Sequence, residues 1–74
     1  MKTVEDIQYE IAERYSIMTE NNATPQEILK EIQTERRRHI NALKNQGLSL
    51  GQAAAKVIDI ERLVAKEISG FTIK

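Results

Sequence analysis

The sequence predicts an all-α fold, a three-helix bundle whose helices run up, down and up within a single helical domain covering residues 1–74. Apolar residues recur every three or four positions and not every second one, which is the spacing of an amphipathic helix. Two turn signals, near residues 22 and 47, divide the chain into three segments. Three helices of roughly 20 residues joined by short turns suit an antiparallel bundle.

The first helix is expected over about residues 4–20. Thr3, followed three residues later by Asp6, forms an N-cap arrangement in which side-chain oxygens accept hydrogen bonds from free backbone N–H groups. Asn21 and Asn22 supply the turn signal after the helix. The apolar stripe of this segment comprises Val4, Ile7, Ile11, Tyr15 and Met18.

The second helix is expected over about residues 25–46 and has the strongest start signal in the chain. Thr24 supplies a capping hydroxyl, Pro25 occupies the first helical position, and Glu27 supplies a carboxylate at the reciprocal position. Gly47 is the expected left-handed stop. The apolar positions of this segment are Ile28, Leu29, Ile32, Ile40 and Leu43.

The third helix is expected over about residues 50–69, with Ser49 as N-cap and Gln52 at the reciprocal position. It ends at Gly70, and Phe71 is placed to fold back on the last turn. At 100° per residue, one face of this helix is apolar and faces the core. That face comprises Ala53, Val57, Ile60, Val64 and Ile68.

A second face of the same helix carries small or apolar side chains, namely Gly51, Ala55, Ile58 and Ala65. Small side chains permit a close approach between helices, so this helix is expected to be contacted from two sides. A chain of 74 residues with three aromatic side chains builds only a thin core. We therefore expect the protein to self-associate as a homodimer through this face.

The composition excludes several classes of protein. Eleven basic residues balance 11 acidic residues, so the protein is not a uniformly basic nucleic-acid or membrane-surface binder. The absence of cysteine excludes a disulfide framework and a thiolate zinc site. Apolar runs do not exceed four residues, and the N-terminus has no secretory pattern, so we expect a cytoplasmic protein without a membrane span.

The sequence favours no catalytic, metal or cofactor chemistry. Glu27, Glu31 and Glu35 follow one another at a spacing of four, which is typical of a solvated face with local cationic partners. His39 is the only histidine, and neither a di-metal Glu-x-x-His pattern nor a glycine-rich phosphate loop is present. We therefore expect that the protein is not an enzyme and binds no cofactor.

Charge is distributed unevenly along the chain. Residues 1–35 hold eight acidic against three basic residues, and residues 36–74 hold eight basic against three acidic, giving halves of −5 and +5. Arg36 also stands where a further core residue of the second helix is expected. Its stem can cross the bundle edge toward an acidic neighbour on the first helix, or it can join a patch for phosphate or an acidic partner. That candidate patch comprises Arg36, Arg37, Arg38, Arg62 and Lys66.

Residues 49–68 resemble the helix-turn-helix segment of DNA-binding proteins. The small and apolar positions that carry the resemblance are Ala54, Val57 and Val64. The resemblance implies that Glu61, Arg62 and Lys66 face the DNA groove. It departs from the family at the turn, where Ile58 and Asp59 replace the usual glycine and apolar residue. A second set of residues falls near another family pattern, namely Ile40, Leu43, Gly47, Leu48, Leu63 and Val64, with Ile60 and Glu61 in the place of a Leu-Asp pair. Through them residues 32–67 resemble the helical-hairpin aspartyl-phosphate phosphatases of sporulating bacteria, although Val57 and Ile58 replace the Ser-Gln of that family's signature.

These observations predict a small helical protein that acts by binding another protein, as an accessory or regulatory factor. Chains of this size without catalytic residues are often encoded by phages and other mobile elements. The alternative is a nucleic-acid-binding protein that uses the basic C-terminal half and the degenerate helix-turn-helix at 49–68.

Overall fold

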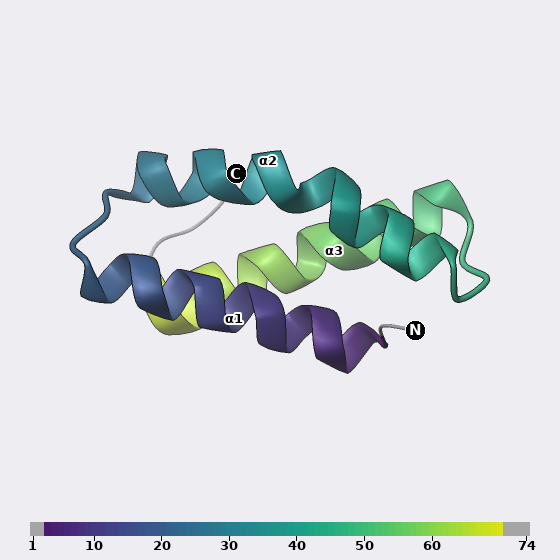
Figure 1. Cartoon of the computed structure of the whole chain (residues 1–74), viewed down its shortest axis with the longest axis horizontal. Helices are drawn as coiled ribbons and strands as arrows, with labels where there is room; N and C mark the ends of the chain where they lie inside the picture. Colours follow the sequence, from purple (N-terminus) through teal and green to yellow (C-terminus); the bar gives the residue numbers. More distant parts are fainter. Residues whose placement is uncertain (1–2, 71–74) are drawn as a thin grey trace.

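The computed structural model describes residues 3–70, and within them the chain forms three helices that run alternately along the long axis of the molecule (Figure 1). The helices are α1 (Val4–Glu20), α2 (Pro25–Lys44) and α3 (Leu50–Val64), and a π-helical turn, η1 (Ala65–Ser69), continues α3. The molecule measures 36 × 23 × 19 Å. The predicted all-α, up-down-up bundle is confirmed.

Each helix begins at a reciprocal capping box, as predicted. In every box the hydroxyl of the N-cap residue accepts a hydrogen bond from the third helical N–H, and the side chain of that third residue accepts one from the N-cap N–H. The pairs are Thr3–Asp6, Thr24–Glu27 and Ser49–Gln52. In the second pair, hydrogen bonds from the backbone and the hydroxyl of Thr24 lower the pKa of the Glu27 carboxyl.

The helix ends differ in detail from the predicted ones. α2 stops at Lys44, two residues before the predicted end, because Asn45 and Gln46 form a turn that Gly47 completes with a left-handed φ of 99°. The third helical segment runs to Ser69 as predicted, but its last turn widens into η1 before Gly70 caps it with a φ of 71°. Phe71 lies outside the described residues.

The predicted apolar stripes form the core. α3 packs against both α1 and α2, and it also contacts η1, whereas α1 and α2 pack against each other less extensively. The buried apolar residues are Ile7, Ile11, Tyr15, Ile28, Ile32, Leu43, Ala53, Val57, Ile60, Val64 and Ala65. Two members of the predicted stripes differ from expectation, because Ile68 is 36% exposed and Leu29 is only half-buried. His39, which was not assigned to any stripe, is buried on α2.

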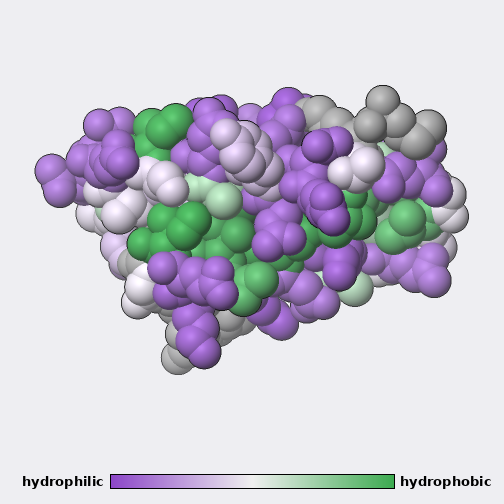
Figure 2. Space-filling view, turned by 90° about the horizontal axis from the view of Figure 1, so that it is seen from below, coloured by the Kyte–Doolittle hydropathy of each residue, from purple (hydrophilic) through white to green (hydrophobic). Residues whose placement is uncertain are grey.

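Some apolar surface remains outside this core. On the side of the molecule where α1 lies, hydrophobic side chains reach the surface between hydrophilic ones (Figure 2). The large apolar side chains that stay exposed across the described chain are Tyr9, Ile17, Leu50, Leu63 and Ile68. No helix within residues 3–70 is long and apolar enough to cross a membrane.

Candidate functional site

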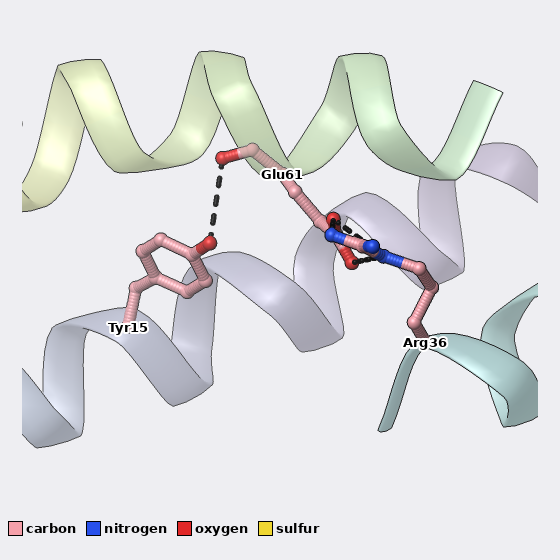
Figure 3. A network of polar contacts seen from close by, with 3 residues as sticks. All are labelled: Tyr15, Arg36 and Glu61. Carbon is pink, nitrogen blue, oxygen red and sulfur yellow. Dashed lines mark hydrogen bonds and ion pairs between the residues drawn. The ribbon is translucent and has the colours of Figure 1, made fainter. Parts of the chain in front are cut away.

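A buried polar network joins all three helices (Figure 3). The Glu61 side chain on α3 is completely buried, and its Oε1 accepts a hydrogen bond from Arg36 Nη2 of α2 at 2.6 Å. Arg36 Nε lies 3.0 and 3.2 Å from the two carboxylate oxygens, so the contact is bidentate. The hydroxyl of Tyr15 on α1 donates a hydrogen bond to the Glu61 carbonyl oxygen at 3.4 Å.

The electrostatics of this network follow from its burial. Burial, followed by the nearby charge of Glu61, raises the pKa of the Tyr15 hydroxyl, while Arg36 opposes this shift. The hydrogen bonds to Glu61 raise the pKa of Arg36, so the guanidinium stays charged. These groups fix how the three helices pack, and they leave Arg36 unable to bind an external phosphate without abandoning a buried carboxylate.

Two expectations about this region were wrong. Arg36 does cross the bundle edge, but its acidic partner lies on α3 and not on the first helix. The helix-turn-helix resemblance implied that Glu61 faces a DNA groove, and the residue is instead fully buried. A signal for its burial was present in the sequence, because Glu61 follows core residue Val57 by four positions and therefore lies on the same helical side.

The five residues of the predicted basic patch do not form one surface. Arg36 is committed to Glu61, and Arg38 forms an ion pair with Glu35 at 2.8 Å. The three others, Arg37, Arg62 and Lys66, are exposed and have no ion-pair partner within residues 3–70. These three are therefore the exposed cations of the patch without an intramolecular ion pair in the described chain, whereas Arg38 is 59% exposed but paired.

The predicted self-association face also loses a member. Ala65 is completely buried in the core of the single chain, so it cannot contact a second copy. Gly51 and Ala55 are exposed, and Ile58 is half-buried. The helix-turn-helix resemblance is not matched by a turn, because α3 continues as one helix through Ile58 and Asp59.

A concave surface lies between α1 and α2, which pack against each other less extensively than either packs against α3. This α1–α2 cleft has a volume of about 460 Å³. It is lined by Glu10, Ile11, Glu13, Arg14, Tyr15, Ile17, Glu31, Ile32, Glu35, Arg38 and His39. The lining thus contains four carboxylates against two arginines and one histidine, with apolar side chains among them.

Charged groups are organised around this cleft. His39 is only 5% exposed, and its Nε2 lies 3.6 Å from Glu10 Oε2 across the cleft. Arg14 of α1 reaches Glu31 of α2 at 3.7 Å. Since Arg38 pairs with Glu35, both arginines of the cleft already have acidic partners, and the excess of negative charge remains on α1.

Apolar surface accompanies that charge. Ile17, at the lining of the cleft, is 49% exposed, whereas Ile11, Tyr15 and Ile32 beside it are buried. A cleft with apolar side chains and an excess of carboxylates is suited to a ligand that presents an apolar group flanked by cations. His39 and this cleft were missed at the sequence level, because both depend on how α1 and α2 pair.

A second, shallower hollow lies where α2 ends and α3 begins. Among residues 3–70 no acidic side chain lines it, and the lining comprises Gln33, Arg36, Arg37, Ile40, Asn41, Lys44 and Leu50. Leu50 is 62% exposed, and neither Arg37 nor Lys44 has an ion-pair partner in the described part of the chain. We call this hollow, with Arg37, Lys44 and Leu50, the basic end. Its charge is opposite in sign to that of the α1–α2 cleft.

Within residues 3–70, no group of three or more histidine, aspartate or glutamate side chains is arranged to hold a metal ion. No protein-family model matches the chain, and neither a curated protein nor a solved structure matches it significantly. The function is therefore inferred from the geometry of the clefts and charges described above.

Proposed function

We propose that the protein acts by binding another protein, and that the α1–α2 cleft is its docking surface. The observation that carries the proposal is the combination, in one concave surface, of a half-exposed Ile17 with four carboxylates and only two arginines. Protein interfaces use apolar anchors surrounded by polar groups, and charge complementarity then selects the partner.

The chemistry of the cleft supports binding over catalysis. Among the described residues, its lining combines a half-exposed isoleucine with charged groups that are largely engaged with one another. His39 is buried against Glu10, and both arginines are paired with glutamates. An accessory or regulatory role in the cytoplasm fits such a binding module and completes the proposal.

Nucleic-acid binding is the second candidate, and the three exposed cations Arg37, Arg62 and Lys66 favour it. Binding to phosphates would weaken steeply as salt concentration rises, because each neutralised phosphate releases counterions. A gel-shift titration with random DNA at about 50 mM salt tests it. Retardation that disappears in the Arg37→Ala variant supports this candidate, and the absence of any retardation removes it.

Site-specific photo-crosslinking tests the protein-binding proposal in the cells that make the protein. A photoreactive residue replaces Ile17 in the cleft, and a matched probe replaces Tyr9, which is 69% exposed on α1 but does not line the cleft. We expect a discrete crosslinked protein from position 17 and none from position 9. Equal crosslinking from both positions, or none from position 17, would contradict the proposal.

A further inference from the structure

We propose that the occupant of the α1–α2 cleft is a second copy of this chain, which docks its basic end there. The basic end is defined by Arg37, Lys44 and Leu50. The inference rests on the proposed function, since it uses the same cleft as the docking surface, and it names the partner. Three features support it: the opposite charges of the two surfaces, the exposed apolar side chain on each surface, and the zero net charge of the whole chain.

The charges of the two surfaces are complementary. The cleft carries four glutamates, and its two arginines are already paired, so Glu13 and its neighbours present excess negative charge to an approaching molecule. The basic end has no acidic lining residue, and Arg37 and Lys44 are without ion-pair partners within residues 3–70. Opposite potentials attract the two surfaces to each other, and like potentials disfavour contact between two clefts or between two basic ends.

The apolar groups are complementary as well. Leu50 stands at the start of α3 with 62% of its surface exposed, and it lines the same hollow as Arg37 and Lys44. Ile17 is 49% exposed at the cleft. Docking the basic end into the cleft would allow these two apolar side chains to be buried, with the polar contacts around them excluding water from the centre of the interface.

The overall charge of the chain favours association between copies. Its net charge is zero, so two copies do not repel each other at long range. Along the sequence the charges nevertheless divide into halves of −5 and +5. Among the described residues, the cleft carries the acidic excess and the basic end carries cations without ion-pair partners. A neutral chain with separate acidic and basic surfaces is complementary to itself.

The mode of association follows from the use of two different surfaces. A contact between the cleft of one copy and the basic end of the next is heterologous, so an open assembly keeps one free cleft and one free basic end, whereas a closed ring keeps neither. The product is a short chain or a closed ring. This mode differs from a symmetric dimer through Gly51, Ala55 and Ile58, because those residues do not line either surface.

Sedimentation velocity on the purified chain tests the inference at about 50 mM and about 500 mM salt, since exposed charges are screened at the higher concentration. We expect species larger than a monomer at low salt and a monomer at high salt. Glu13→Lys disables the cleft and Leu50→Asn disables the basic end, and each should weaken association roughly tenfold or more. The matched controls Glu5→Lys and Leu63→Asn change exposed residues outside both surfaces and should associate like the original chain.

Mixing the two variants gives the sharpest result. The Leu50→Asn chain keeps an intact cleft and the Glu13→Lys chain keeps an intact basic end, so the mixture should form a one-to-one heterodimer that grows no further. A monomeric chain up to about 100 μM at low salt overturns the inference, because useful interfaces bind in the micromolar range or tighter. Association that survives in both variants also overturns it.

The proposed function can survive that failure. If position 17 crosslinks to a different protein while the purified chain stays monomeric, the cleft is a docking surface and its occupant is not a second copy. If position 17 yields no crosslink and the purified chain is monomeric, the proposed function and the inference both fail.

Discussion

The two flanks of α2 hold arginine–glutamate pairs in opposite surroundings. Toward α3, Arg36 meets a Glu61 side chain with no exposed surface, through bidentate hydrogen bonds as short as 2.6 Å. Toward α1, Arg14 and Glu31 are 54% and 36% exposed and lie 3.7 Å apart. We call the first the closed flank, because its glutamate has no exposed surface, although a shallow hollow lined by Arg36 and Leu50 lies along it. The second, the open flank, opens into the α1–α2 cleft.

This difference teaches which charges shape the fold and which remain available for binding. A buried pair tolerates no loss of one partner, because the remaining charge is left without water or a counterion. An exposed pair contributes little and exchanges partners readily, because water and salt screen it. The closed flank therefore specifies the fold, and the open flank is free to bind.

The largest effect is expected from breaking the closed flank. Arg36→Ala leaves the Glu61 carboxylate buried and unpaired, so it should lower the free energy of unfolding by about 3–5 kcal/mol, measured by urea denaturation followed by helical circular dichroism. The double variant Arg36→Met with Glu61→Leu removes both charges and should be close to neutral. A loss below about 1 kcal/mol in the single variant would show that this ion pair does not hold the flank closed.

Tyr15→Phe should have a smaller effect at neutral pH, about 0.5–1.5 kcal/mol, because one hydrogen bond to the Glu61 carbonyl is lost. At high pH the stability difference between the original protein and the Tyr15→Phe variant should shrink. The raised pKa of Tyr15 means that the unfolded chain releases this proton first, so the native protein loses stability as pH rises above about 10.

Unfolding free energies measured between neutral and alkaline pH check this sign. The Tyr15→Phe variant should lose the alkaline decline that the original protein shows, and Tyr9→Phe, an exposed control, should retain it. An identical alkaline decline in the original chain and in Tyr15→Phe would contradict the assignment.

Gly51→Ala should stabilise the single chain by about 0.5–1 kcal/mol, because alanine restricts the unfolded chain and favours the helix. An added Cβ at this position meets nothing within 4 Å. Thermal unfolding measures the gain.

Association at low salt should be unchanged in the exposed Ala55→Gln variant, whereas weaker association would place the interface on α3 instead of the cleft.

The smallest effect is expected on the open flank. Arg14→Ala removes an exposed ion pair and should change the free energy of unfolding by roughly 0–0.5 kcal/mol, with no change at high salt. Urea denaturation at two salt concentrations measures this. A loss comparable to that of Arg36→Ala would remove the distinction between the two flanks.

The helices could be predicted from the sequence because their signals are local. Thr24, Pro25 and Glu27 determine a helix start from adjacent residues alone, and the structure places α2 there. The apolar stripes likewise reflect only the helical period, so Ile7, Ile11 and their counterparts were correctly assigned to the core.

The candidate sites could be predicted only in part, because they depend on contacts between distant residues. Arg36 and Glu61 are 25 positions apart, and their pairing follows from the register of α2 against α3. Burial of Ala65 depends on the packing of the third helical segment, and burial of His39 depends on α1. None of these relations is encoded in the spacing within one helix.

The most direct test of the open flank as a binding surface is a concentration titration followed by backbone amide chemical shifts at low salt. We predict concentration-dependent shifts in residues 10–17 of α1 and residues 44–50 at the basic end, both of which disappear at high salt. Shifts confined to residues 51–62 of α3, or no shifts at any concentration, would contradict the account.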